Sequence, residues 1–147
     1  MKALVTGVAG QLGHDVMNEL ARRGYEGIGS DIKEIYSGIQ DGTAVVSMPY
    51  VQMDITDEDS VRKVLADAAP DVVVHCAAWT AVDLAEDEDK KEIVYAVNAT
   101  GTKNIADICK ELDCKISRPA QGLPAGAGLS HADTLTLMKA LEGRTAL

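Results

Sequence analysis

The chain has 147 residues, of which 46% are hydrophobic and 25% charged, as in an ordinary globular protein. Its formal net charge of −9 argues against a nucleic-acid partner, because phosphate backbones are bound by basic surfaces. Aromatic residues make up 3% and Phe is absent, so the core must consist of Val, Ile, Leu and Ala. That composition is typical of buried parallel strands covered by helices.

The cysteine pattern and the hydropathy argue against a metal-binding protein and against a membrane protein. Cys76, Cys109 and Cys114 form no CxxC pair and no ligand set with histidine, so no metal site is expected. No apolar run reaches the ~18 residues of a membrane-spanning helix. We therefore expect a cytoplasmic protein with reduced thiols.

The first part of the chain alternates between strand and helix. Residues 2–6 form an apolar run that ends in a glycine turn, which predicts a buried strand. Residues 11–23 have helical spacing, with Leu12, Val16, Met17 and Leu20 on one face, and Gly24 marks the end. A second strand is predicted at 27–30, ending at Asp31.

The same alternation continues to about residue 112. Residues 32–49 read as an irregular surface loop, and 51–55 as a third strand. A helix is predicted over 57–68, with Thr56 as its N-terminal cap and Asp59 completing a capping box. A fourth strand at 71–76 precedes a long helix at about 89–112, whose inward face is Ile93, Val97, Ile105, Ile108 and Leu112. This order predicts the α/β class, a doubly wound parallel sheet of the Rossmann type.

The character of the sequence changes after about residue 116. We expect a dinucleotide-binding portion at 1–116, a linker rich in Gly, Pro and Ala at 117–129, and an amphipathic helix with a tail at 130–147. The helix is expected over 130–141, with Leu135, Met138 and Leu141 on one face. Two partners for that face remain open: the helix at 89–112, or a second copy of the chain in a homodimer.

Three glycines follow the first strand at a spacing suited to phosphate binding. Gly7, Gly10 and Gly13 stand between the strand and the first helix, in a GxxGxxG pattern. Glycines there permit a tight turn, close approach of backbone to pyrophosphate, and close packing of helix on strand. The amides at the helix N-terminus then face the anion. A merely structural turn is the alternative, but the strand before and the helix after favour a nicotinamide dinucleotide.

An acidic residue stands where the second strand ends. Asp31 lies 18 residues after Gly13, the place from which a carboxylate accepts hydrogen bonds from the adenosine ribose. Its charge would repel a 2′-phosphate, which favours NAD, although NADP stays open. The alternative role for Asp31 is a helix cap or a solvent contact.

Four segments in order carry a resemblance to a known family. VTGVAGQLG at 5–13 resembles the entry to the extended short-chain dehydrogenase/reductase family, and MDITD at 53–57 resembles its adenine-contacting D-[IV]-x-D segment. HCAAWTAVD at 75–83 and VNATGT at 97–102 are similar to its segment after the fourth strand and its VNxxGT helix. The details GQLG and AAxTAVD are similar to the dTDP-4-dehydrorhamnose reductases, which reduce a 4-keto sugar nucleotide in making dTDP-L-rhamnose.

The resemblance implies a set of cofactor contacts. Asp54 would bond the adenine amine and Ile55 would pack on the ring. The alternatives are a strand-end cap for Asp54, and small residues chosen only for packing at Ala77 and Ala78. Ala77, Ala78 and Thr80 would lie along the nicotinamide side, and Asn98 would form a hydrogen-bond hub near the active site. The expected cofactor-binding residues are Gly7, Gly10, Gln11, Leu12, Gly13, Asp31, Ile32, Asp54, Ile55, Ala77, Ala78, Thr80 and Asn98. His75 is expected to be structural, and His14 is assigned no role.

The family's catalytic pair is missing. Its chemistry uses Tyr-x-x-x-Lys with a Ser or Thr, but the residues four positions after Tyr25, Tyr36, Tyr50 and Tyr95 are Gly, Gln, Asp and Ala. No catalytic residue is therefore assigned, and the residues past 116 are expected to come from a truncation, a frameshift or an alternative ending. The chain is expected to be an inactive portion of a sugar-nucleotide oxidoreductase. A non-catalytic NAD(P)-binding sensor module and a fragment of a sugar-nucleotide epimerase are the alternatives.

Overall fold

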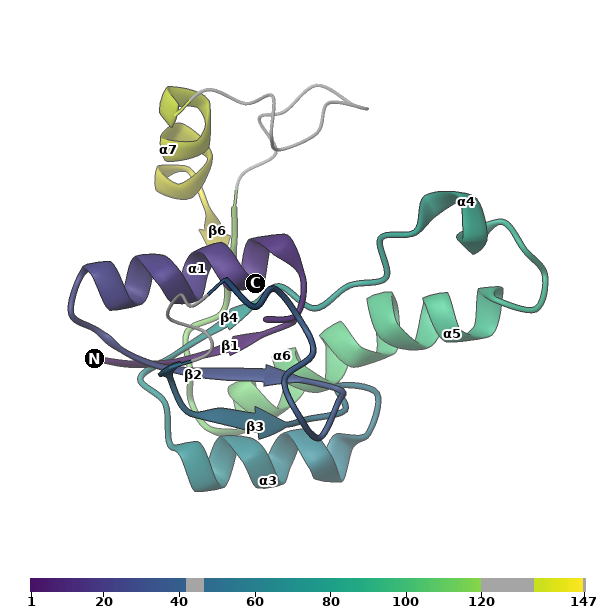
Figure 1. Cartoon of the computed structure of the whole chain (residues 1–147), viewed down its shortest axis with the longest axis horizontal. Coiled ribbons are helices and arrows are strands. Elements are labelled where there is room, and N and C mark those ends of the chain that lie inside the picture. The colour runs from purple at the N-terminus through teal and green to yellow at the C-terminus, as the bar shows by residue number, and fades with distance from the viewer. Residues whose placement is uncertain (42–46, 120–133, 147) are drawn as a thin grey trace. The chain divides into compact units, whose positions relative to one another are not determined.

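A four-stranded parallel sheet forms the centre of the N-terminal unit. The structure, a computed structural model, describes residues 1–41, 47–119 and 134–146 and divides into two compact units, 1–108 and 109–147. In the first unit the strand order is β3-β2-β1-β4 (Figure 1). The strands are β1 (Lys2–Thr6), β2 (Glu26–Asp31), β3 (Tyr50–Gln52) and β4 (Val72–His75). The predicted parallel α/β sheet is confirmed, with β3 and β4 shorter than expected.

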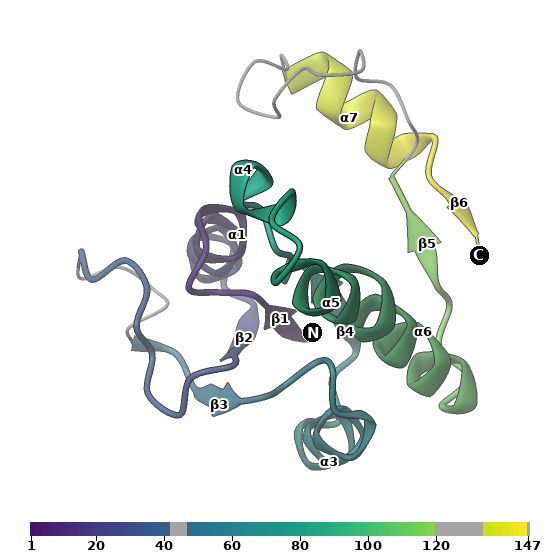
Figure 2. The same cartoon turned by 90° about the vertical axis from the view of Figure 1, so that its right-hand side faces the viewer.

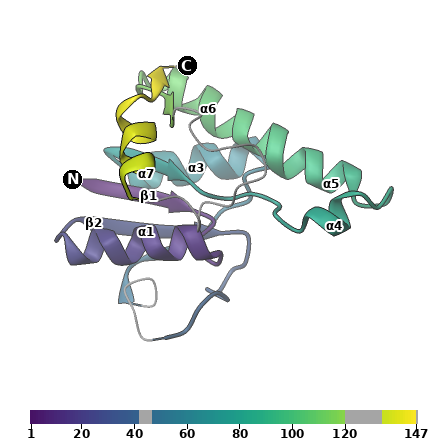
Figure 3. The same ribbon diagram turned by 90° about the horizontal axis from the view of Figure 1, so that it is seen from above.

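Helices cover both faces of this sheet. Helix α1 (Gln11–Arg22) lies on one face, and α3 (Glu58–Ala68) lies on the other (Figures 2 and 3). The segment α5 (Lys91–Tyr95), η1 (Ala96–Gly101) and α6 (Thr102–Glu111) is one continuous helix, in which η1 is a π-helical turn. A single turn, α4 (Val82–Ala85), precedes it.

The core lies between the sheet and the helices. Leu4, Val5, Val8 and Met17 are fully buried, and Ile105 and Ile108 bury the inner face of α6. Removing each such side chain from water contributes roughly 1.5–3 kcal/mol. Three positions predicted to face the core are exposed instead: Leu12, Ile93 and Leu112.

These three errors have physical causes. At the start of α1, Gly13 and His14 take the buried positions, because Gly13 packs directly against the loop that follows β1. In the long helix, the π-helical turn changes the number of residues per turn. Ile93 lies before that turn, in α5, where no residue is buried, so its exposure is that of the whole segment. Leu112 lies beyond the last residue of α6.

The N-terminal cap of α3 also differs from the expectation. The cap is Asp57, whose Oδ1 accepts from the Asp59 amide at 3.0 Å. The predicted cap, Thr56, donates its hydroxyl to Asp54 instead, at 2.7 Å. The helix begins one residue late because Thr56 is bound back to the preceding turn. It ends at Ala69, which has a left-handed backbone (φ 41°).

The second unit contains a short antiparallel pair and one helix. β5 (Ser117–Arg118) pairs with β6 (Thr145–Ala146), so residues 117 and 118 of the predicted linker belong to a strand. α7 (Thr134–Glu142) lies within the range expected to be a helix, and Leu135, Met138 and Leu141 are about half exposed. Residues 120–129 of the linker and 130–133 of the helix lie outside the described residues. Among the described helices, none has the length and hydropathy to cross a membrane.

Candidate functional site

The loop after β1 is shaped by two glycines that tolerate no side chain. Gly7 has φ +70°, and a Cβ there would lie 2.6 Å from the backbone nitrogen of Ala77, in the loop after β4. A Cβ at Gly13 would lie 2.4 Å from the carbonyl oxygen of Gly7. Gly7 therefore joins the β1 and β4 loops, and Gly13 lets α1 begin directly against the turn.

Gly10 differs from its two neighbours. A Cβ there would only touch the Gly7 oxygen, at 3.4 Å, so the space beside Gly10 is open within the described part of the chain. Gly10 is also the N-cap of α1 and provides no side-chain cap. The first-turn amides of Gln11, Leu12 and Gly13 lack intrahelical acceptors by the geometry of an α-helix. An open surface with uncapped amides is what an anionic phosphate group requires.

Asp31 lies next to this loop, at the end of β2. Its Oδ2 accepts from the Ala9 amide at 3.0 Å, and its Oδ1 accepts from the Ile32 amide at 2.8 Å. A carboxylate has about four acceptor sites, so two remain for further donors. Asp31 therefore fixes the glycine loop and keeps the capacity to bind a hydroxyl pair.

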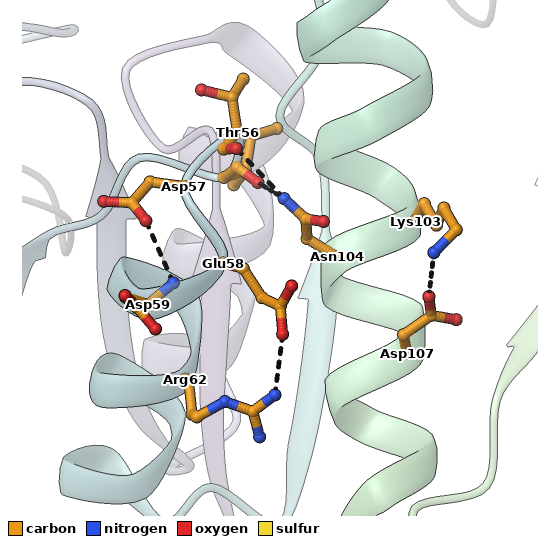
Figure 4. Close-up of polar contacts among 9 residues, drawn as sticks. Thr56, Asp57, Glu58, Asp59, Arg62, Lys103, Asn104 and Asp107 are labelled. Atoms are coloured by element: carbon orange, nitrogen blue, oxygen red, sulfur yellow. Dashed lines mark hydrogen bonds and ion pairs between the residues drawn. The ribbon is translucent and has the colours of Figure 1, made fainter.

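A second loop, which follows β3, carries the predicted adenine contacts. Asp54 Oδ1 accepts from both the amide and the hydroxyl of Thr56, at 2.9 and 2.7 Å. Asn104 on α6 donates to the carbonyl oxygens of Ile55 and Thr56, at 2.9 and 3.2 Å (Figure 4). Ile55 is 7% exposed and packs against Gly101 of η1. The loop is thus held in place from the helical side.

A hydrogen-bond network links the ends of β1 and β4 to the long helix. The hydroxyl of Thr6 contacts His75 Nδ1 at 2.8 Å and accepts from the amides of Cys76 and Ala77, at 3.1 and 3.2 Å. His75 Nε2 contacts the Thr102 hydroxyl at 3.2 Å, and that hydroxyl donates to the Asn98 carbonyl at 2.9 Å. Burial lowers the pKa of His75. Both ring nitrogens have partners, which agrees with the expected structural role.

Asn98 holds the loop after β4 from the other side. Its Oδ1 accepts from the Trp79 amide at 2.7 Å, and its Nδ2 donates to the Trp79 carbonyl at 3.2 Å. Ala78 and Thr80 are exposed in this loop, whereas Ala77 lies against Gly7. The VNATG segment therefore contributes one side chain, in a π-helical turn, that fixes the backbone of the loop. Such turns are frequent at functional sites.

The predicted site residues follow the carboxyl ends of all four strands. Gly7 to Gly13 follow β1, Asp31 and Ile32 stand at the end of β2, Asp54 and Ile55 follow β3, and Ala77 to Thr80 follow β4. In parallel sheets, ligands bind at this edge, where the strand order reverses. Here that reversal lies between β1 and β4, the two strands joined by Gly7 and Thr6.

Some contributors were not anticipated. Thr6 has no sequence signal beyond its place at the end of a buried strand. Gly38 is a second example, because a Cβ there would lie 2.6 Å from the Ala9 Cα, so the segment after β2 lies on the glycine loop. His14 is buried, with its ring near Tyr36 and Asp41, rather than near solvent. Within the described ranges, no three His, Cys, Asp or Glu side chains gather as metal ligands would.

Two family models match successive parts of the chain. Residues 1–118 match the family described as RmlD substrate binding domain, and residues 122–145 match the family described as RecR, C-terminal. A dTDP-4-dehydrorhamnose reductase of Mycolicibacterium smegmatis is 32% identical over 144 residues, 98% of this chain and 33% of that protein. Recombination protein RecR of Clostridium perfringens is 45% identical over 64 residues, 40% of this chain and 32% of that protein.

A solved structure supports the same relationship. The structure of dTDP-4-dehydrorhamnose reductase from Bacillus anthracis in complex with NADP is 29% identical, with a TM-score of 0.58 over 78% of this chain and 34% of that one. The chain thus spans about a third of the length of the relatives it matches. The residues past 116 thus contain a segment that matches a different family from that of residues 1–118. Over residues 1–118, where sequence, fold and glycine loop agree, the chain belongs to the RmlD substrate-binding domain family, within the extended short-chain dehydrogenases.

Proposed function

We propose that residues 1–116 are the NAD(P)-binding portion of a sugar-nucleotide oxidoreductase that resembles dTDP-4-dehydrorhamnose reductase. The observation that carries this proposal is the difference between the glycines. Gly7 and Gly13 are required by backbone contacts, whereas Gly10 has open space and stands at an uncapped helix N-terminus. In a purely structural turn, Ser, Asp or Asn would cap α1 better than glycine does. Glycine leaves the space beside position 10 open to the pyrophosphate of a dinucleotide.

Each remaining contact has a proposed role. Asp31 accepts from the adenosine ribose with its two unused acceptor sites. Asp54 and Ile55 hold the adenine end, and Ala77, Ala78 and Thr80 line the nicotinamide end. Asn98 acts through the loop after β4, whose backbone it fixes at Trp79. Gln11 and Leu12 contribute backbone amides around the phosphates, and Ile32 lies beside Asp31 at the ribose, with its amide bonded to that carboxylate.

The proposed cofactor is NAD rather than NADP. The Asp31 carboxylate stands at the end of β2, bonded to Ala9 of the glycine loop, so it is close to the ribose that would be bound there. A 2′-phosphate would meet this negative charge. The NADP complex of the Bacillus anthracis relative is the reason to test both cofactors.

The chain as given is proposed to bind cofactor without reducing a substrate. Bound nicotinamide would supply a hydride, but the carbonyl that receives it also needs a proton from a positioned acid. In the family that acid is the Tyr of Tyr-x-x-x-Lys, and no Tyr of this chain has a Lys four residues later. We therefore propose 4-keto sugar nucleotides as substrates of the complete enzyme that this portion resembles, and not of the chain as given.

Fluorescence titration with NADH tests the binding, and a turnover assay tests the inactivity. We expect saturable binding, tighter for NADH than for NADPH, and no reduction of a dTDP-4-keto sugar. Gly10→Val is the specific variant, since its side chain would enter the phosphate space and abolish binding. Ala21→Val, at an exposed position near the far end of α1, is the control. Binding by the Gly10 variant, or turnover by the unmodified chain, would contradict the proposal.

A second function is favoured by the match of residues 122–145 to a different family. The chain would then be a non-catalytic NAD(P)-binding module whose C-terminal part contacts a partner. The half-exposed face of Leu135, Met138 and Leu141 is the proposed contact, and a second copy of the chain is the simplest partner. Measurement of the mass in solution tests the dimer. The location proposed for either function is the cytoplasm, consistent with three free cysteines.

A further inference from the structure

Proton counting fixes the tautomer of His75. The Thr102 hydroxyl has one hydrogen and donates it to the Asn98 carbonyl. In its contact with His75 Nε2 at 3.2 Å, Thr102 must therefore accept, so Nε2 carries the proton. In a neutral ring Nδ1 is then an acceptor, and the Thr6 hydroxyl donates to it at 2.8 Å.

The Thr6 hydroxyl is saturated in this arrangement. Its hydrogen goes to His75 Nδ1, and its two lone pairs accept from the amides of Cys76 and Ala77. Thr6 is 1% exposed, so water does not compete for these bonds. Ala77 is the residue that the Gly7 backbone touches. One chain of bonds thus runs from the long helix to the meeting point of the β1 and β4 loops.

We propose that His75 is a positioning residue for the dinucleotide site: as a neutral Nε2–H imidazole it directs the Thr6 hydroxyl so that Thr6 holds the Cys76 and Ala77 amides against the glycine loop. This inference rests on the function proposed above. His75 itself contacts no cofactor in this arrangement, because it acts through Thr6. The sequence segment alone does not reveal this link.

The arrangement predicts what a second proton would do. A protonated His75 becomes a donor at Nδ1, but the Thr6 oxygen has no lone pair left. One amide of the loop after β4 must then lose its acceptor. The loop at Ala77 would separate from Gly7, and the nicotinamide side of the site would loosen.

Within the described residues, no charged group bonds the His75 ring and stabilises its protonated form. The groups that bond the ring from β1 and α6 are the neutral hydroxyls of Thr6 and Thr102, and the next titratable group along β4 is the Cys76 thiol, whose pKa burial raises. Lys103, beside Thr102, is paired with Asp107 (Figure 4). Burial is the sole cause of the lowered His75 pKa.

The test follows the ring, the loop and cofactor binding over pH 5–8 in the full chain. Nitrogen-15 NMR of the imidazole is expected to show the Nε2–H tautomer at pH 8. The amide signals of Cys76 and Ala77 are expected to shift together with the His75 titration. The NADH dissociation constant is expected to rise by up to about tenfold per pH unit below the His75 pKa, because only the neutral form binds well.

Variants separate positioning from general stability. His75→Gln removes the titrating group, so the rise of the NADH dissociation constant at low pH is expected to disappear. Thr6→Val deletes the hydroxyl at nearly constant volume and should weaken NADH binding at pH 8 and speed exchange of the Ala77 amide. Thr6→Ser keeps the hydroxyl and should restore both.

Two results would overturn the positioning role: an Nδ1–H tautomer at pH 8, or a His75→Gln variant whose NADH dissociation constant still rises at low pH. An Ala77 amide signal that does not shift when His75 titrates would also refute the positioning role. If the unmodified chain binds no NADH at pH 8, the proposed function fails instead. The ring and amide measurements still decide the role of His75 in that case, because they need no cofactor.

Discussion

Gly13→Ala should lower stability and Gly10→Ala should lower NADH binding, although both glycines belong to one loop. At Gly13 the new Cβ would lie 2.4 Å from the Gly7 oxygen, 2.8 Å from the Gly7 carbonyl carbon and 2.9 Å from the Val8 Cα. Favourable contacts between such atoms lie near ~3.5 Å, so the overlap is about 1 Å. All three neighbours are backbone atoms, which cannot turn away as a side chain would. Helix α1 must therefore move off the loop.

The expected cost of Gly13→Ala is at least the ~1–3 kcal/mol typical of overpacking. This is a large part of the ~5–15 kcal/mol of a typical domain. Gly10→Ala meets only the Gly7 oxygen, at 3.4 Å, and its φ of −87° suits alanine. Alanine lowers the conformational entropy of the unfolded chain, which stabilises the folded state by about 0.4–1 kcal/mol. This gain offsets the loss that comes from alanine being a poorer N-cap than glycine. Its stability should stay within about 1 kcal/mol of the parent.

Urea unfolding and NADH titration of both variants measure this contrast. Gly13→Ala should lower the unfolding midpoint strongly. Gly10→Ala should keep the midpoint and lose most of its affinity for NADH, because its methyl group occupies phosphate space. Equal destabilisation by the two substitutions would refute the division of the loop into a structural glycine and a ligand-facing glycine. So would undiminished NADH binding by Gly10→Ala.

Three further predictions concern single side chains. Asp57→Ala should lower the free energy of unfolding by about 1 kcal/mol through loss of the α3 cap, whereas Asp57→Asn should retain it, as urea titration would show. Asp31→Ser should raise the affinity for NADPH relative to NADH, since the charge that repels the 2′-phosphate is removed; an unchanged ratio of dissociation constants would contradict this. His75 has a folded pKa below its ordinary 6.5, so its stabilising effect is fully present above pH 6.5 and is lost as pH falls through the lower folded value. Thermal unfolding between pH 5 and 8 should show this decline in the parent chain and a shallower one in His75→Gln.

The sheet and the glycine loop were predictable because strong local signals determine them. An apolar run before Gly7 and helical spacing after Gly10 predict a strand, a turn and a helix in order. Asp31 was predictable as the residue that ends the next apolar strand. The structure puts its carboxylate 3.0 Å from the Ala9 amide, which the sequence could not specify.

The errors arise where tertiary contacts decide. Thr56 and Asp57 both suit an N-cap, and the choice depends on Thr56 bonding back to Asp54. Ile93 is exposed together with the rest of α5, where no residue is buried, although its helical spacing suited a core position. The role of Thr6 required knowledge of which strands are neighbours, since its partners lie about 70 residues away.

The position of the polar network and the glycine contacts along the chain has a consequence for sequence variation. All of their members, from Thr6 to Thr102, lie within the unit of residues 1–108. The two family matches meet between residues 118 and 122, beyond that unit. A change of sequence after residue 118 therefore removes none of the bonds described for the unit of residues 1–108. The segment that follows can vary while every one of these bonds stays in place.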